Sequence, residues 1–174
     1  MADLLKDIKA RRSVRSYKSE PVDEAIVEKV IEAGLYAASG MNRQDSIIIS
    51  VSNKELRDRL SRLNAAVMGA SDRDPFYGAP NVLVVLTSME NPNRVYDGSL
   101  VIGNMLLEAH SLGIGSCWIH RAKEVFQSEE GKKILAELGV TGEYEGIGNV
   151  ILGYVDGEYP AEKERVAGRV YYAK

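Results

Sequence analysis

Cysteine is nearly absent from this chain, and the single Cys117 can form neither an internal disulfide nor a metal site built from several thiolates. Long hydrophobic runs are missing too, because the longest apolar stretches, such as Val82 to Leu86, have the length of a strand and are too short to cross a bilayer. The N-terminus lacks the basic and apolar regions of a secretory signal. These absences predict a globular protein of the reducing cytoplasm.

Positive charge is not in excess either. Lys and Arg together number 22 against 25 Asp and Glu, which gives a net charge of -3. A general nucleic-acid or membrane-surface binder carries a basic excess, so we expect neither partner. The H-E-x-x-H, P-loop, G-x-S-x-G and G-x-G-x-x-G patterns do not occur, which leaves metalloprotease, NTPase, serine hydrolase and Rossmann functions without support.

No repeat and no low-complexity linker interrupts the chain, so we expect residues 1–174 to form one domain. Apolar residues at helical spacing, together with capping residues, predict helices over 3–11, from Asp23 to about Ala38, after Asn53, over 96–111 and after Ser128. β-Branched apolar runs predict strands at 46–51, 81–87, 115–119 and 146–154.

The first of these strands is apolar throughout, and we expect it to be buried on both faces. Strands that alternate with helices indicate an α/β or α+β sheet surrounded by helices, and the alternation alone favours a more parallel sheet. The helix at 96–111 is apolar nearly all round, so it forms the core of this domain or packs on a partner chain. A helical core shared by two subunits is the favoured interpretation.

Two clusters of cationic side chains contrast with the negative net charge. The first comprises Arg11, Arg12, Ser13 and Arg15, and the second Lys163, Arg165 and Arg169. Guanidinium groups and a Ser hydroxyl suit a phosphate dianion, which they bind through charge-assisted and partly bidentate hydrogen bonds. The alternative is that each cluster is a solvated face, and composition alone leaves both interpretations open.

Two further segments combine small residues with polar groups. In AASGMNRQ, a helix end is followed by Asn42 and Gln44, whose amides suit the polar edge of a flat heterocycle. Helix capping and turn chemistry explain this spacing more simply. In LGIGSCWIHRA, a short strand ends at His120 and Arg121, where sites commonly form. His120 is then either a proton donor near neutral pH or an exposed loop histidine, and the second alternative is the simpler one.

Five segments form an ordered set along essentially the whole chain. They are RRSVRSY, AASGMNRQ, YGAP before an apolar strand, YDGSLVIGNMLLEAHSLGIGSCWI, and LGY before a basic tail. This set resembles the nitroreductase family of FMN enzymes. The resemblance implies an α+β fold, with a central antiparallel-rich sheet surrounded by helices, in an intertwined homodimer.

The resemblance also implies two FMN sites at the subunit interface, each built from both subunits. The residues that correspond to the phosphate and ribityl cradle are Arg11, Arg12, Ser13 and Arg15, with Lys163 and Arg165 from the tail. Arg15 would also lie near the pyrimidine edge of the flavin. The loop that the other subunit lays against the flavin corresponds to Ser39, Asn42 and Gln44. The main chain of Ile119, His120 and Arg121 would approach the flavin N5 atom.

Some positions depart from the family pattern. Relatives often have Pro before the loop serine and Pro-Trp after the loop glutamine, where this chain has Ala38 and Asp45-Ser46. Many relatives have Glu-Gly or Gly-Ala in place of His120-Arg121. These two side chains could project over the flavin or add charge near a phosphate.

The implied activity is an FMN-dependent oxidoreductase. Hydride would pass from NAD(P)H through the bound flavin to a small electron-poor acceptor, such as a nitroaromatic or a quinone, in ping-pong order. Two alternatives stay open at this point. One is a different flavin chemistry on the same fold, such as reductive dehalogenation, and the other is a non-catalytic FMN-binding or redox-sensing module.

Overall fold

The structure, a computed structural model, describes residues 4–174. Its four-stranded sheet has the order β1-β2-β4-β3 and every neighbouring pair is antiparallel. The strands are β1 (Ser46–Val51), β2 (Asn81–Ser88), β3 (Gly115–Ile119) and β4 (Tyr144–Gly153). The helices are α1 (Leu4–Ala10), α2 (Glu24–Leu35), α3 (Lys54–Met68), α4 (Arg94–Ser111), α5 (Ala122–Gln127) and α6 (Glu129–Glu137), with a short 3-10 helix η1 (Gly40–Asn42).

The α+β class with an antiparallel sheet is confirmed, and the more parallel sheet favoured by alternation is wrong. The end of β1 lies beside the start of β2, since Val51 pairs with Val82 and Ser46 with Thr87. The connection through α3 therefore returns to the end of the sheet where β1 finished. The order of strands and helices along the sequence does not reveal whether paired strands are parallel or antiparallel, because that depends on the end of the sheet at which each connecting helix returns the chain.

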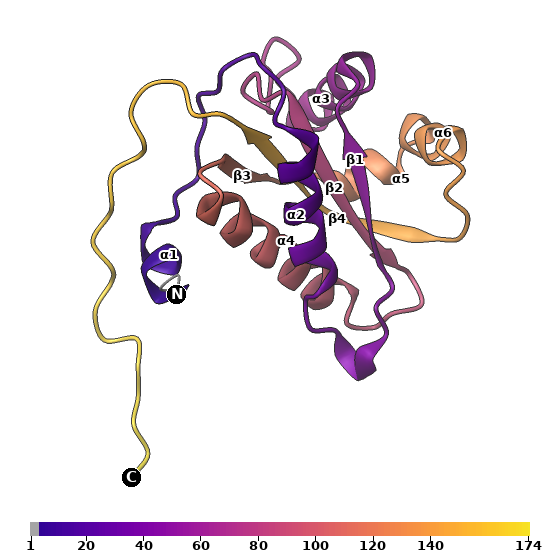
Figure 1. The fold of residues 1–174 in the computed structure, drawn as a ribbon. Helices are drawn as coiled ribbons and strands as arrows, with labels where there is room; N and C mark the ends of the chain where they lie inside the picture. Colours follow the sequence, from indigo (N-terminus) through magenta and orange to yellow (C-terminus); the bar gives the residue numbers. More distant parts are fainter. Residues whose placement is uncertain (1–3) are drawn as a thin grey trace.

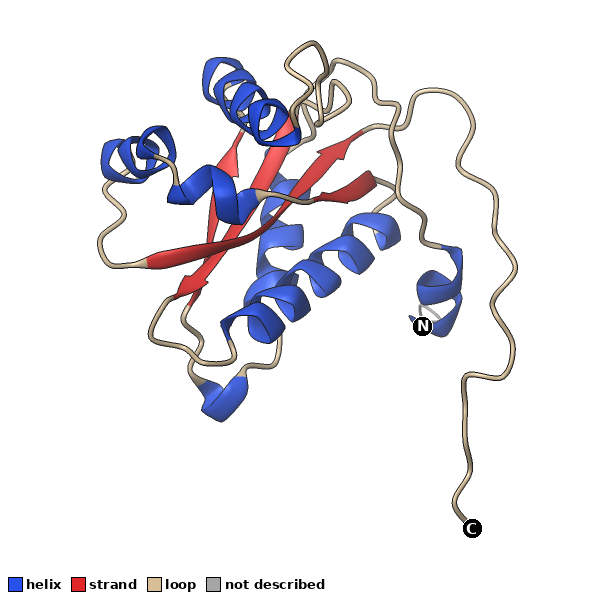
Figure 2. Ribbon diagram, turned by 180° about the vertical axis from the view of Figure 1, so that it is seen from behind, coloured by secondary structure: helices blue, strands red, loops and turns tan. Residues whose placement is uncertain are grey.

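The sheet is the middle of three layers. Helices α2 and α4 cover one face, and α3, α5 and α6 cover the other (Figures 1 and 2). Strand β2 supplies both cores by alternation, since Leu83 and Val85 face α2 and α4 while Val82, Val84 and Leu86 face the opposite layer. Burial on both faces explains why this strand is an unbroken apolar run.

Strand β1 does not follow this rule, and the prediction that both of its faces are buried is wrong. Residues 46–49 are half-buried, Ser50 is exposed and Val51 alone is buried. The physical reason is position, because β1 is the outermost strand on its side of the sheet and only β2 pairs with it among the described residues.

The helix ends agree with the predicted caps. The carboxylate of Asp23 accepts the Ala25 N–H at the start of α2, Asn53 accepts the Leu56 N–H at α3, and Ser128 accepts the Gly131 N–H at α6. Helix α2 ends at Leu35, three residues before the predicted end. Asp3, where we predicted the first helix to begin, lies outside the described residues. Helix α5 was not predicted, because it is short and no side chain caps it.

Helix α4 has a buried face and an exposed apolar face. The buried face packs on the sheet and α2 through Ile102 and Met105. On the other side Val95, Tyr96 and Leu100 are 48%, 73% and 50% exposed. Helix α1 has no buried residue, and the chain from residue 161 onward is exposed and leads away from the sheet (Figure 1). A large apolar surface is thus left uncovered in the single chain.

Candidate functional site

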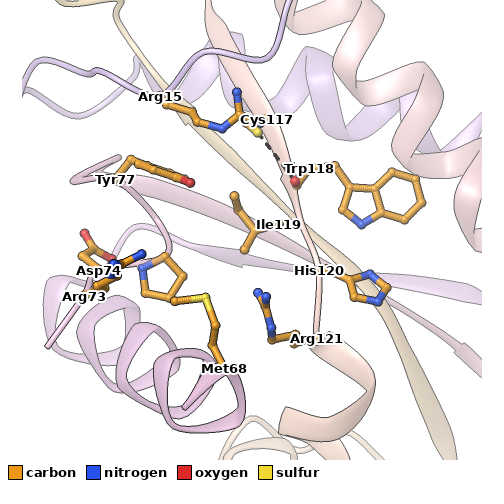
Figure 3. Close-up of a pocket in the computed structure, with 11 residues that line it drawn as sticks. Arg15, Met68, Arg73, Asp74, Tyr77, Cys117, Trp118, Ile119, His120 and Arg121 are labelled. Carbon is orange, nitrogen blue, oxygen red and sulfur yellow. Dashed lines mark hydrogen bonds between the residues drawn. The ribbon is translucent and has the colours of Figure 1, made fainter. Parts of the chain in front are cut away.

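A cavity of about 340 Å³ lies between the end of α3, the loop at 69–80 and strand β3 (Figure 3). Its lining comprises Arg15, Met68, Arg73, Asp74, Pro75, Tyr77, Cys117, Trp118, Ile119, His120 and Arg121. The volume is at the lower end of the range of roughly 300–1,000 Å³ typical of ligand sites. Four residues that we predicted from separate segments meet here, namely Arg15, Ile119, His120 and Arg121.

The side chains at the end of β3 and directly after it point alternately to the two sides of the strand. Ile119 and Arg121 point toward Met68 and Tyr77, whereas the rings of Trp118 and His120 point to the other side of the strand (Figure 3). A second cavity of about 400 Å³ is lined by Trp118, His120 and Arg121 together with residues of α4, α5 and β4. The His120 side chain is exposed, and the main-chain carbonyl of His120 accepts a hydrogen bond from the side chain of Asn64.

The segment that carries the first basic cluster runs along the outer edge of β3. Ser13 forms a parallel bridge with Ser116, and the Val14 N–H donates to the Ser116 carbonyl at 3.0 Å. The buried Tyr17 hydroxyl donates to the Val14 carbonyl at 2.6 Å, and burial raises the pKa of Tyr17 far above its usual range, so that it stays a donor. This path places Arg15 at the cavity, with its Cζ atom 5.9 Å from the centre of the Tyr77 ring.

Arg11 has an unused donor. Its Nη1 atom is buried and has no hydrogen-bond partner within residues 4–174. A buried guanidinium N–H without an acceptor is costly, so the position fits an anionic group from outside the chain. Ser13, two residues further, adds a hydroxyl on the same segment. This arrangement fits the phosphate of FMN.

Arg12 differs from its neighbour because the chain itself uses its donors. Its Nη1 atom donates to the carbonyls of Lys9 at 2.6 Å and Arg11 at 2.8 Å. Its Nη2 atom lies 3.4 Å from a carboxylate oxygen of Glu162, and its Nε atom donates to the Ala161 carbonyl. In this structure Arg12 fastens the start of the C-terminal tail to the end of α1. Its predicted role as a phosphate ligand stays a prediction.

Tyr159 completes this attachment. Its hydroxyl accepts the main-chain N–H of Arg12 at 2.8 Å and lies 3.1 Å from Nδ1 of His110 on α4. Lys163 and Arg165 follow directly in the tail, and both are exposed. The contacts at Tyr159, Ala161 and Glu162 therefore fix the position of the tail segment from which the Lys163 and Arg165 side chains extend. Sequence reasoning assigned no role to His110, whose partner is 49 residues away.

The predicted loop lies at a separate cavity of about 220 Å³. Ser39 and Gln44 line it together with Asp97, and it shares no lining residue with the Arg15 cavity. The Asp97 carboxylate accepts the Gly40 N–H at 3.1 Å, and the Gln44 side chain donates to Oδ1 of Asn42 at 2.8 Å. Within one chain, the predicted loop of Ser39, Asn42 and Gln44 is therefore separated from the predicted residues at the Arg15 cavity.

The residues that depart from the family pattern in this loop have structural partners. Oδ1 of Asp45 accepts from Nδ2 of Asn91 at 2.9 Å, and the hydroxyls of Ser46 and Thr87 lie 2.7 Å apart. The first bond fixes the loop to the segment that joins β2 to α4, and the second joins the start of β1 to its neighbouring strand β2. These replacements therefore hold the loop in place by hydrogen bonds.

Residues with a left-handed backbone lie at the Arg15 cavity and beside the cavity of about 220 Å³. Among residues 4–174 five residues other than glycine have a positive φ angle, and they are Met41, Asn42, Gln44, Tyr77 and Arg121. Three belong to the loop beside the small cavity and two line the Arg15 cavity. Such conformations cost free energy and gather where function constrains the backbone. Three of the five, Asn42, Gln44 and Arg121, are among the residues predicted for the site.

Asn64 and Asp74 were missed by sequence reasoning. The Asn64 side chain donates to the His120 carbonyl at 2.7 Å, and its own Oδ1 is buried without a partner within residues 4–174. Asp74 accepts from Arg57, the Ser61 hydroxyl and two main-chain N–H groups of its own loop. Partial burial opposes ionisation, but these hydrogen bonds prevail and hold the pKa of Asp74 below its usual value. Only the Asp/Pro/Gly content of the loop hinted at this turn.

Comparison with known proteins agrees over most of the chain. The model of the nitroreductase family matches residues 8–154. A relative from Archaeoglobus fulgidus, provisionally named NADH dehydrogenase/NAD(P)H nitroreductase, is 30% identical over 100% of this chain and 99% of its own length. One with the same name from Methanothermobacter thermautotrophicus is 33% identical over 67% of this chain, which spans only 60% of that relative. A solved structure of a nitroreductase with bound FMN from Bacteroides fragilis is 30% identical, with a TM-score of 0.90 and 100% of both chains covered.

Proposed function

Because the chain belongs to the nitroreductase family, we propose that it is an FMN-dependent oxidoreductase that takes hydride from NAD(P)H and reduces a nitroaromatic, a quinone or a similar electron-poor acceptor in ping-pong order. The observation that carries the proposal is the buried Nη1 atom of Arg11, which has no hydrogen-bond partner within residues 4–174, together with a cavity that gathers Arg15 and the end of β3. We also propose that residues 1–174 act as one FMN-binding domain in the cytoplasm.

The residues of this chain supply binding and electrostatics. Arg11 and Ser13 hold the phosphate, and Lys163 and Arg165 close over it from the anchored tail. Arg15 places positive charge at the pyrimidine edge, where negative charge gathers on the ring. When bound, FMN supplies the hydride and electron transfer itself, which the protein side chains need not perform.

The end of β3 orients the ring by its main chain. The N–H groups of Ile119, His120 and Arg121 face the N5 side in this proposal. Asn64 supports them, because its bond to the His120 carbonyl fixes the peptide at the strand end. The geometry of these main-chain groups thus depends on α3, which packs behind the strand.

A homodimer completes the site in this proposal. Ser39 and Gln44 line a cavity separate from that of Arg15, and Asn42 is hydrogen-bonded to Gln44, which supports our assignment of this loop to the flavin of the other subunit. The apolar residues exposed on α4 and the extended tail supply surface for such an interface (Figure 1). Each flavin is then held between two subunits.

The direct test is the visible spectrum of protein supplied with FMN and passed through gel filtration, before and after anaerobic NADH or NADPH. A yellow protein that bleaches with either nucleotide supports the proposal. A yellow protein that neither nucleotide bleaches would favour a non-catalytic FMN-binding module or a different flavin chemistry. A colourless protein would remove the cofactor assignment.

Tyr159→Phe tests the attachment of the tail. The variant loses the hydroxyl that accepts the Arg12 N–H, which is worth about 0.5–1.5 kcal/mol and loosens the segment before Lys163. We expect the dissociation constant for FMN, measured by fluorescence titration, to rise about 3- to 10-fold. Riboflavin, which lacks the phosphate, should bind as before. Tyr171→Phe, at an exposed tail residue beyond the attachment, is the matched control, and equal losses for both flavins would contradict the assigned role.

A further inference from the structure

Three guanidinium groups surround the cavity of about 340 Å³, and they belong to Arg15, Arg73 and Arg121. Within residues 4–174 none of them forms an ion pair or a side-chain hydrogen bond, and Arg15 alone has a partner, the Tyr77 ring. The one carboxylate in the lining, Asp74, is already occupied by Arg57, Ser61 and its own loop. The cavity therefore holds an unbalanced positive charge in a protein whose net charge is -3.

FMN does not use all of this charge. Under the proposed function, its phosphate is met by Arg11, Ser13 and the tail, and its pyrimidine edge by Arg15. Arg73 and Arg121 then still face the cavity without an anionic partner. Unbalanced cations that converge on one cavity indicate a second anionic ligand.

The backbone that carries each of these two side chains is held in place. Arg73 precedes Asp74, whose four accepted hydrogen bonds fix the turn of this loop. Arg121 has a left-handed backbone with φ of 74°, which turns its side chain toward Ile119 and Met68 (Figure 3). A left-handed Arg costs free energy at a position where glycine would fit, so its presence indicates a use for the side chain.

We propose that Arg73 and Arg121 bind the phosphate groups of the nicotinamide nucleotide donor at the mouth of the flavin cavity. This inference rests on the proposed function, because the donor has to reach the flavin in order to reduce it. The donor carries a pyrophosphate, and NADPH carries a further phosphomonoester, whereas a nitroaromatic or quinone acceptor need carry no charge. Planar guanidinium groups suit phosphate oxygens by bidentate, charge-assisted bonds.

The test compares three donors in the anaerobic reduction of the FMN-loaded dimer, followed by the loss of flavin absorbance. The donors are NADPH, NADH and N-benzyl-dihydronicotinamide, which has the same reacting ring and no phosphate. In Arg73→Gln we expect the half-saturating concentration of NADPH, NADH or both to rise about tenfold, with the phosphate-free donor unaffected. Arg121→Gly, which keeps the left-handed backbone, should raise the half-saturating concentration of the same nucleotide donors. Because the main chain of Arg121 faces the flavin in the proposed function, the unchanged rate with the phosphate-free donor is expected of Arg73→Gln alone. Arg62→Gln, at an exposed position of α3, is the control.

The outcomes are distinct. A larger effect on NADPH than on NADH assigns the pair to the phosphomonoester, and equal effects on both assign it to the pyrophosphate. Reduction of the wild type by all three donors, with Arg73→Gln and Arg121→Gly unchanged or equally slowed for all of them, would overturn this inference and leave the proposed function intact. Reduction by none of the donors would overturn the proposed function itself.

Discussion

Arg11→Ala is expected to raise the dissociation constant for FMN about 10- to 100-fold while the constant for riboflavin changes little. The reason is that hydrogen bonds to charged groups contribute about 1.5–3 kcal/mol each, and Nη1 of Arg11 is buried with no partner among residues 4–174. Removing this guanidinium takes away the donor that the phosphate would satisfy. Fluorescence titration with both flavins measures the difference directly.

The comparison of the two flavins distinguishes a lost phosphate contact from a general loss of folding. A protein that unfolds loses both ligands, whereas a lost phosphate contact affects FMN alone. Arg62→Ala provides a matched control, since it removes an exposed arginine from α3. If Arg11→Ala binds FMN as tightly as the wild type, the assignment of the phosphate to this segment is wrong.

Leu100→Glu is expected to convert the proposed dimer into a monomer and to release the flavin with it. Leu100 is 50% exposed beside Tyr96 on the outer face of α4, which we assign to the subunit interface. A symmetric interface would receive the new charge twice, and burying unpaired carboxylates is costly, so the dissociation constant of the dimer should rise at least about 100-fold. Light scattering reports the mass, and the absorbance of the same peak reports the flavin.

Leu138→Glu is the control for this experiment, because Leu138 is 46% exposed at the end of α6 on the other side of the sheet. This variant should remain dimeric and yellow. The interface assignment fails if Leu100→Glu stays dimeric, or if the wild type is a stable flavin-loaded monomer.

Local features of the fold could be predicted from the sequence. The caps at Asp23, Asn53 and Ser128 and the apolar runs of the four strands depend on neighbouring residues, and each appears where it was predicted. Strand direction and the exposed edge at β1 could not be predicted, because they depend on which distant strand pairs with which. The family resemblance supplied the antiparallel sheet.

The features of the candidate site likewise comprise some that could be predicted from the sequence and others that could not. The RRSVRSY and GSCWI segments were identified by composition, but the bridge from Ser13 to Ser116 that brings them together spans most of the chain. Arg11 and Arg12 look equivalent in sequence, and only their contacts separate an unused donor from a tail anchor. Asn64 was missed because a polar residue on a helix resembles surface until its burial is known.

The five left-handed residues have a consequence for protein engineering. A left-handed conformation costs a residue other than glycine or asparagine roughly 1–2 kcal/mol, so Met41, Gln44, Tyr77 and Arg121 lower the stability of the fold together. Glycine at these positions would relieve that cost and raise the melting temperature. Gln44 and Arg121 are also residues that we propose to contact the flavin, so this gain in heat resistance would come at the proposed site. A thermostable variant of this protein that keeps its activity therefore has to be sought elsewhere, in the helices away from the proposed site and on the β1 edge of the sheet.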